Sequence, residues 1–350
     1  MQLIRDITDS LRLDLDECAI HSPEYGNGLA DHLPMLLHAM HALGASPERR
    51  AAYVSQYAQR LEPRYTATLS TTSWRDLRGN IDAFDLLDKK FSARIAAEGR
   101  DAVLRDLLPA LMPGVGASAF HGLIRCGHAV TARHDGELAR GLAYWAAAWF
   151  KLLPYEEAGD LPVPTLDLAT WVACAHELVT TADTEPPRIV LRMKAWAASP
   201  QFAGLAPALR ADRDTLDVVA RFAATLYAQT GNFTVMHMVT SVHALLVLRP
   251  WFEYPVLAAR WFGVSLFAAL RAARLTHEQI AHALHALAAP NPASETPLPS
   301  WDVLAAGAIA SDDDHAAKIV YSSRALFEML GDEVFHAAAA RGVLVQAKSG

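Results

Sequence analysis

The sequence predicts an all-α protein, and three observations lead to this fold class. Between Leu33 and Leu43, and again between Leu138 and Trp149, apolar residues recur three or four positions apart, which is the period of an amphipathic helix. Runs of alternating β-branched residues, which are typical of strands, are nearly absent. Prolines and glycines separate the helical segments at Pro47, Pro113-Gly114, Pro162 to Pro164, Pro186-Pro187 and Pro290 to Pro299.

The starts of three helices can be placed from the sequence. Pro34 is tolerated only in the first turn of a helix, where its missing N–H has no partner, so a helix begins next to His32. The turn from Pro113 to Gly116 places another start at His121. A third is predicted after Asp312-Asp313-Asp314, because aspartates cap helix N-termini and complement the helix dipole.

Length and composition favour one domain. Of the 350 residues, 52% are hydrophobic and 20% are charged, which is enough apolar surface for a large core. The only linker-like stretch runs from Pro290 to Pro299, and the chain after it is too short for a domain of its own. We therefore predict a single large helical domain over residues 1–350, with a surface loop near residues 290–300.

The charge pattern argues against nucleic acid and membrane partners. The net charge is −7 and there is no basic run, so the chain lacks the electrostatic footprint of either partner. The most apolar region, Phe233 to Leu270, is interrupted by charged residues and Pro250, and we expect it to be buried core rather than a membrane span. The N-terminal residues lack the apolar segment of a secretory signal.

The cysteines point to a reducing compartment. Cys18, Cys126 and Cys174 are isolated and form no C-x-x-C pair, which argues against a zinc knuckle, a redox pair or a disulfide framework. We expect reduced thiols in a cytoplasmic protein that acts on a small molecule. The sequence leaves a homodimer open.

The chain has 15 histidines, and several lie in apolar helical segments, where an unpaired imidazole is costly to bury. His121 lies at a predicted helix start. His237 lies in the uncharged segment Asn232 to Thr240, where only a specific partner or a metal makes a polar ring favourable. Each of them, taken alone, also fits a hydrogen-bonded core histidine.

The segment Asp312 to Lys318 is the most informative local pattern. If a helix begins there, His315 and Lys318 lie on one face, three residues apart, and their side chains point the same way. The simpler interpretation is that the aspartates cap the helix while His315 and Lys318 are solvated or paired to them.

Three histidines fall near the first predicted helix. His32 lies at its N-terminus, whereas His38 follows about 600° further around the helix and does not share its face. We expect His38 and His41 to be surface residues, or to lie near a metal site without binding the metal themselves.

Five segments, in this order along the chain, together resemble the questin oxidase-like family. They are Asp31 to Met35, Phe120 to Arg125, Ala139 to Trp145, Phe233 to Thr240 and Asp312 to Lys318. The family contains fungal enzymes of anthraquinone and aflatoxin-type polyketide pathways. For an anthraquinone ring-cleaving dioxygenase of this kind, the resemblance implies a non-haem iron held by four histidines and a carboxylated lysine. Carried over by motif, the metal ligands and catalytic residues are His32, His121, His237, His315 and Lys318.

Two positions depart from the family pattern. Asp31 stands where the family has Asn, and Asp314 stands where it has Glu. We expect Asp31 to accept a proton from a ligand imidazole and so to raise its basicity. The chain is also shorter than the fungal members, so the identity of the substrate does not transfer.

Other classes of enzyme fit the residues less well. A carboxylate-bridged di-iron bundle needs Glu-x-x-His pairs, and the nearest pattern is the reversed His134 to Glu137. Binuclear hydrolases with a carboxylated lysine need a barrel of alternating strands and helices. Gly114 to Ala119 matches G-x-G-x-x-A, but Ala102 to Leu108 before it has helical spacing, whereas a dinucleotide site must follow a strand.

The sequence thus predicts an iron-dependent oxygenase that uses O2 to oxidise or cleave a ring of a polycyclic aromatic substrate. Imidazole ligands suit iron, although zinc or nickel can also occupy such a site. The alternatives are an NADPH-dependent Baeyer-Villiger-type monooxygenase and a non-catalytic helical binding protein.

Overall fold

The fold is all-α, as predicted. The computed structural model describes residues 8–69, 73–288 and 297–346. Within them the regular structure consists of 17 α-helices, short 3-10 turns and one hairpin of two strands, β1 (Glu24–Tyr25) and β2 (Leu29–Ala30). The strands are antiparallel, with Glu24 opposite Ala30.

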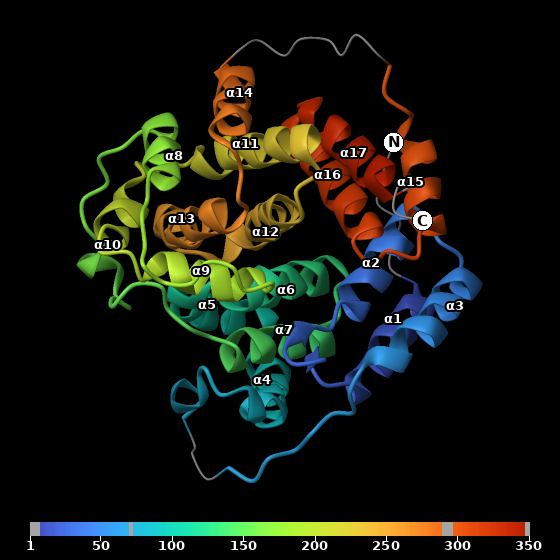
Figure 1. Cartoon of the computed structure of the whole chain (residues 1–350). Helices are drawn as coiled ribbons and strands as arrows, with labels where there is room; N and C mark the ends of the chain where they lie inside the picture. The colour runs from blue at the N-terminus through green and yellow to red at the C-terminus, as the bar shows by residue number, and fades with distance from the viewer. Residues whose placement is uncertain (1–7, 70–72, 289–296, 347–350) are drawn as a thin grey trace.

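The helices follow one another along the chain, joined by connections of very different length (Figure 1). Their bounds are α1 Asp9–Glu17, α2 Leu33–Leu43, α3 Pro47–Tyr57, α4 Phe84–Glu98, α5 Arg100–Leu111, α6 His121–Thr131, α7 Asp135–Ala147, α8 Leu168–His176, α9 Ile189–Ala197, α10 Phe202–Leu205, α11 Thr215–Thr230, α12 Phe233–Leu248, α13 Pro255–Ala272, α14 His277–Ala288, α15 Trp301–Ala310, α16 Ala316–Leu330 and α17 Val334–Gln346.

The predicted helix starts are confirmed. His32 is the N-cap of α2, which carries Pro34 in its first turn. Helix α6 begins at His121, and α16 begins at Ala316, with His315, the residue after the aspartate cluster, as its N-cap. Helix α5 precedes Gly114, so the G-x-G-x-x-A segment follows a helix and lacks the context of a dinucleotide site.

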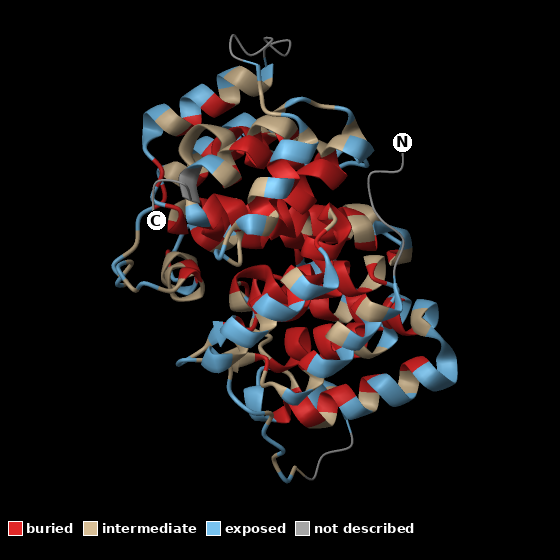
Figure 2. Cartoon of the chain, turned by 90° about the vertical axis from the view of Figure 1, so that its right-hand side faces the viewer, coloured by how far each residue is buried: buried red, intermediate tan, exposed pale blue. Residues whose placement is uncertain are grey.

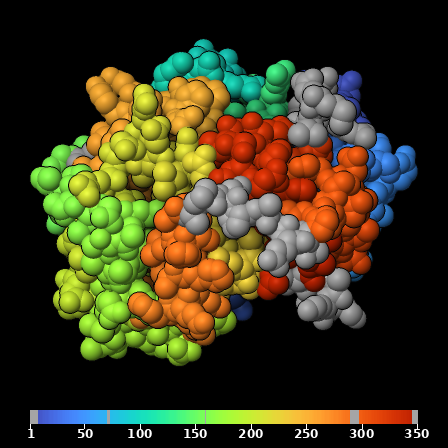
Figure 3. Space-filling view, turned by 90° about the horizontal axis from the view of Figure 1, so that it is seen from above, coloured from blue at the N-terminus to red at the C-terminus, as the bar shows by residue number. Residues whose placement is uncertain are grey.

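Four helices from distant parts of the chain surround the centre of the molecule. Helix α2 packs on α6, α6 on α12, α12 on α16, and α16 back on α2, which closes a ring. Seen from above, the C-terminal segments lie against the N-terminal ones (Figure 3). This contact between the two ends of the sequence brings α2 next to α16.

The most apolar region is core, as predicted. The helical stretches Phe233–Trp251 and Pro255–Ala272 are long and apolar enough to cross a membrane, but 78% and 72% of their apolar windows are buried inside the molecule. Figure 2 shows the buried residues gathered along the inner helices and the exposed ones on the outer turns. Residues 289–296 lie outside the described residues, and they include most of the predicted surface loop. The single domain over residues 1–350 stays a prediction.

Candidate metal centre

The N-terminal ends of the four central helices meet at one place. His32 and His315 are the N-caps of α2 and α16, His121 is the first residue of α6, and His237 lies one turn into α12. Side chains in a helix lean toward its N-terminus, so the imidazole of His237 reaches back to the level of the other three. The local sequence therefore brings four imidazoles to one level of the bundle.

The four rings form a closed cluster. The ring centroids of His32 and His121 are 4.6 Å apart, those of His121 and His237 are 5.0 Å apart, and those of His237 and His315 are 6.0 Å apart. The ring centroids of His315 and His32 are 4.9 Å apart, which closes the circle. Lys318 is buried and acts electrostatically on His32, His121 and His237, so all five residues that the family resemblance implied lie together.

Two of the imidazoles are oriented by backbone carbonyl groups. The Nδ1 atom of His121 contacts the carbonyl oxygen of Ser118, and that of His237 lies 2.9 Å from the carbonyl oxygen of Phe233. A carbonyl oxygen can only accept, so Nδ1 carries the proton in both rings. In a neutral ring this leaves Nε2 with a free lone pair, which is the form that binds a metal.

The other two imidazoles are oriented by carboxylates. Nδ1 of His32 contacts Asp314, and Nδ1 of His315 lies 2.9 Å from Asp313 Oδ1 and 3.2 Å from Asp314 Oδ1. Although burial raises the pKa of Asp314, hydrogen bonds from His315 and His32 outweigh it and hold the pKa below its usual range. Asp314 is therefore an ionised acceptor that links two of the four imidazoles.

The backbone before His121 adopts an unusual conformation. Ser118, Ala119 and Phe120 all have positive φ, at 46°, 54° and 71°. Such angles cost free energy in residues other than glycine and are found mainly where the surrounding structure enforces them, often at functional sites. Here the turn aims the Ser118 carbonyl at the ring of the residue that begins α6.

The Nε2 atoms provide the test of whether a metal fits. Nε2 of His32 lies 2.7 Å from Nε2 of His121, and the partners of both Nδ1 atoms leave no proton for the space between them. Two facing lone pairs repel unless a cation lies beside them. Two imidazoles at right angles around one metal would place their nitrogens about 2.9 Å apart. Nε2 of His315 is also buried without a partner. Ligand atoms of His32, Asp314 and His315 lie within 4.8 Å of one another, so these residues could hold a metal ion.

Burial keeps the rings of His32, His121 and His237 neutral. It lowers the pKa of His32 to about 3 and those of His121 and His237 well below their usual value. Burial also lowers the pKa of Lys318 to about 8, although Asp314, Asp313 and Asp31 act in the opposite direction. Neutral imidazoles are competent ligands, and an amine with this pKa is partly neutral near pH 7.

The simpler interpretation of the Asp312 to Lys318 segment holds in part. His315 does pair with Asp313 and Asp314, and Asp312 pairs with Arg49 at 3.2 Å. No ion pair joins Lys318 to any of these three aspartates, all of which are described. The buried amine therefore lies beside the histidines without a salt bridge to the aspartates that precede its helix, and none of these aspartates provides a side-chain cap for α16.

One expectation about the surroundings of the site is wrong. Asp31 does not contact a ligand imidazole; its Oδ1 accepts a hydrogen bond at 2.8 Å from the N–H of Leu33, the first residue of α2. Burial raises its pKa to about 6, although Arg125 lowers it. The carboxylate that contacts His32 comes from Asp314, 282 residues further along the chain.

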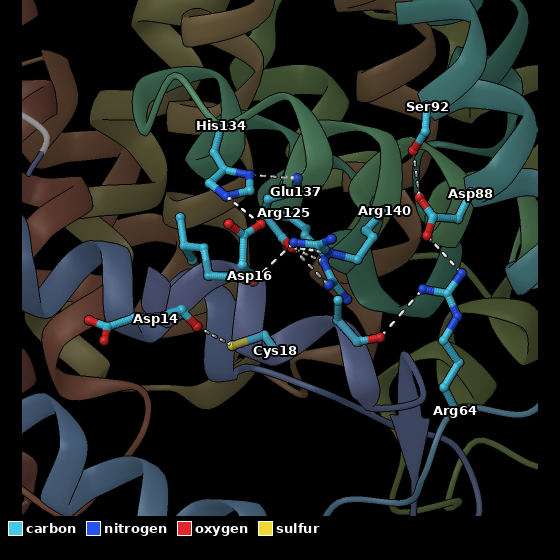
Figure 4. A network of polar contacts seen from close by, with 12 residues as sticks. Asp14, Asp16, Cys18, Arg64, Asp88, Ser92, Arg125, His134, Glu137 and Arg140 are labelled. Atoms are coloured by element: carbon cyan, nitrogen blue, oxygen red, sulfur yellow. Dashed lines mark hydrogen bonds and ion pairs between the residues drawn. The ribbon is translucent and has the colours of Figure 1, made fainter. Parts of the chain in front are cut away.

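A buried ionic network supports the helix that carries His121. Arg125 lies one turn further along α6 and donates to Glu137 on α7, with 3.2 Å between Nη2 and Oε2. Arg140 donates to the same carboxylate at 2.8 Å (Figure 4). Arg125 and Glu137 each expose 2% of their side chains. Because two guanidinium groups share one buried carboxylate, these contacts fix α6 against α7 rather than react.

A second buried cluster lies deeper along the same four helices. His38, His128, His243 and Tyr321 each follow a residue of the first cluster by six or seven positions, or about 9 to 11 Å of helix. The rings of these three histidines pack on Tyr321, with centroids 5.1 to 5.4 Å from its own. His38 is thus outside the first cluster, as expected, but it and His41 are buried, so their placement on the surface is wrong.

A cavity of about 570 Å³ opens beside the first cluster. His32, His121, His237 and His315 line one side of it. Its remaining walls are mostly apolar, from Leu29, Ala30, Ile189, Val190 and Phe233, and its charged lining residues other than histidine are Arg60, Arg188 and Asp314. This volume is in the range of pockets that enclose a multi-ring small molecule.

Sequence reasoning missed Asp314 as an orienting residue and missed both arginines. The adjacency of Asp314 to His315 was a signal for the first, since a carboxylate beside a ligand often orients an imidazole. The arginines carry no comparable signal, because they lie far from the histidines in sequence and meet them only in the folded chain.

Comparison with known families gives one match. The model of the family described as questin oxidase-like matches residues 29–323, which is most of the chain and includes all four histidines and Lys318. No curated protein matches the chain.

Proposed function

The chain belongs to the questin oxidase-like family, whose name implies an oxidase, and we propose that it is an iron-dependent oxygenase. In this proposal His32, His121, His237 and His315 hold one iron through Nε2, and the cavity beside them binds a polycyclic, anthraquinone-like aromatic. When bound, the iron supplies the redox chemistry with O2 that oxidises or cleaves a ring. We place the protein in the cytoplasm, as a monomer or a homodimer.

One observation carries the proposal. The Nε2 atoms of His32 and His121 face each other at 2.7 Å, while both Nδ1 atoms are committed to oxygen acceptors. A non-catalytic protein whose histidines serve only packing would place a proton between two such nitrogens. Among metals, iron is favoured because imidazole ligands suit it and an oxygenase needs a metal with an open position.

Lys318 completes the proposed ligand set. Its buried amine has a pKa lowered by burial to about 8 and no carboxylate partner. A neutral amine adds CO2 with loss of one proton and becomes a carbamate, whose oxygen can bind a metal, whereas an ammonium has no lone pair to give. The carbamate would supply the negative charge that four neutral imidazoles lack.

The residues around the cluster prepare the site for an apolar substrate. The Phe233 ring contacts the rings of both His237 and His315, with centroids 4.8 Å away in each case. It therefore forms an apolar edge between the histidines and the cavity. Asp314, Asp313 and two backbone carbonyls fix the imidazoles, so the metal-binding nitrogens are oriented before a metal arrives.

The proposal is tested by oxygen uptake. Untagged protein reconstituted with Fe(II) under anaerobic conditions is mixed with O2 and a panel of hydroxyanthraquinones. We expect O2 consumption that depends on both the aromatic compound and the iron, and that stops when a chelator removes the metal. Iron-loaded protein that consumes no O2 with any multi-ring phenol would contradict the oxygenase function.

A further inference from the structure

The cavity beside the histidines carries positive charge that no part of the metal cluster uses. Arg60 and Arg188 both line it, and neither makes an ion pair in the described part of the chain. The only carboxylate in the lining, that of Asp314, is already shared by His32 and His315. A protein with a net charge of −7 thus keeps two guanidinium groups in the lining of this cavity, and neither is ion-paired among the described residues.

The two arginines hold the hairpin that forms one wall of the cavity. Arg188 donates from Nη1 to the carbonyl oxygen of Asn27 at 2.7 Å. Gly28 permits this approach: it has a φ of +94°, and a Cβ atom there would lie 2.5 Å from Arg188 Nη1. Arg60 lies beside the hydroxyl of Tyr25, and its Cζ is 4.2 Å from the centre of the Tyr57 ring.

Helix α9 adds unpaired donors at the same wall. Arg188 is its N-cap and provides no side-chain capping bond. The N–H groups of Ile189 and Val190, the first two residues of the helix, have no acceptor in the described residues, and both residues line the cavity. The exposed N–H groups and dipole at the start of a helix favour an anion. The N-terminal ends of α2, α6, α12 and α16 also face this region, which adds to the positive potential.

We infer that the cavity selects a planar aromatic ligand that carries an oxyanion, either a carboxylate or a phenolate, and binds this group between Arg188, the first N–H groups of α9 and Arg60. This inference rests on the proposed function for the aromatic part of the ligand. The apolar walls take the rings, while the oxyanion anchors one end of the molecule at the guanidinium groups. The opposite ring edge is then presented to the histidine cluster. Arg188 and Arg60 are thus specificity-determining residues.

The test uses two ligands of nearly equal shape and different charge. Dissociation constants of anthraquinone-2-carboxylate and anthraquinone-2-carboxamide are measured by calorimetry at pH 7, without O2, on the full chain with a known metal content. We expect the carboxylate to bind about tenfold more tightly, in keeping with a charge-assisted pair in a half-buried site. Because no turnover is involved, the result does not depend on the oxygenase chemistry.

Substitutions assign the preference to the arginines. Arg188→Gln is expected to reduce the preference to about twofold or less while the affinity for the carboxamide is kept, and Arg188→Lys is expected to keep part of it. Arg60→Gln has the smaller effect because Arg60 is more exposed. Arg213→Gln, at a site with 90% side-chain exposure, is the matched control and should bind both ligands as the wild type does.

Each outcome decides the inference. Equal binding of the two ligands by the wild type overturns it and leaves the oxygenase proposal intact. A preference that survives Arg188→Gln unchanged, or a variant that loses both ligands to the same extent, also overturns it. If neither ligand binds the wild type, the polycyclic substrate class fails together with the inference.

Discussion

His237 and His243 lie six positions apart on α12, yet each belongs to a different buried cluster. His237 contacts the rings of His121 and His315 beside the cavity, whereas His243 contacts Tyr321 deeper in the bundle. Both histidines are buried and both keep a neutral ring in the folded state. The pair therefore separates the cost of removing a buried histidine from the loss of a proposed metal ligand.

Asp314 is predicted to set the metal affinity of the site. Asp314→Asn keeps the shape of the side chain but removes the charge that orients His32 and His315, so we expect iron affinity to fall roughly 10- to 100-fold. Asp314→Glu restores the carboxylate and should recover most of the affinity. Competition with a metal chelator measures the iron affinity of the wild type and of both variants. Equal affinity of Asp314→Asn and the wild type would show that the carboxylate is not needed.

Lys318 is predicted to act through a carbamate. Lys318→Ala should lose iron and activity, because it removes the proposed anionic ligand from a site in which the other four are neutral. Acetate or another short carboxylate added to the variant should restore part of both by occupying the space left by the side chain. Metal analysis and O2 uptake provide the readouts. If Lys318→Ala keeps the iron content and turnover of the wild type, Lys318 is only structural.

Glu137 is predicted to be essential for stability rather than chemistry. Glu137→Gln leaves the buried guanidinium groups of Arg125 and Arg140 without their carboxylate, which should cost roughly 3–5 kcal/mol of unfolding free energy. Glu98→Gln, which removes the exposed pair with Arg94, is the control and should lower the unfolding free energy far less, because solvent screens this pair. Urea unfolding measures the change in unfolding free energy of both variants. Similar small losses would contradict the structural role of the network.

The buried histidines are predicted to make the metal-free protein sensitive to acid. Burial lowers the pKa of His243 to about 4 in the folded state. Between that value and the ordinary pKa of about 6.5, the unfolded chain takes up a proton that the folded chain does not, so stability is lost as the pH falls through this window. His243→Gln should therefore reduce the stability lost between pH 7 and pH 5 by about 2 kcal/mol.

The control for this acid prediction is His282→Gln, which changes an exposed histidine on α14. It should leave the difference in unfolding free energy between the two pH values as in the wild type. An identical pH dependence in His243→Gln would show that His243 is protonated in the folded state.

The sequence predicted the positions of the site residues along the helices better than their mutual arrangement. Pro34 identified the helix start at His32, and the aspartates before His315 identified another, because both signals act within one turn. The contact between His32 and Asp314 joins the two ends of the chain through the packing of α2 on α16. Such packing depends on the whole core, so only the family resemblance could anticipate that these residues meet.

Two features of the site had no local signal at all. Ala119 and Phe120 rarely adopt positive φ, so the turn that aims the Ser118 carbonyl at His121 is imposed by the surrounding fold and not by residue preference. Arg188 follows Pro186-Pro187 and looks like an ordinary loop residue in the sequence. Its place at the cavity depends on Gly28, 160 positions earlier, which leaves room for the guanidinium.

The metal content of three proteins tests the central claim most directly. Untagged wild type, His237→Ala and His243→Ala are reconstituted with Fe(II) under anaerobic conditions, freed of loosely bound metal and analysed for iron per chain, with circular dichroism to confirm the helical fold. The wild type and His243→Ala are predicted to hold about one iron each, and His237→Ala to hold little or none. Iron content that is unchanged in His237→Ala, or that is negligible in the wild type, would contradict the metal centre.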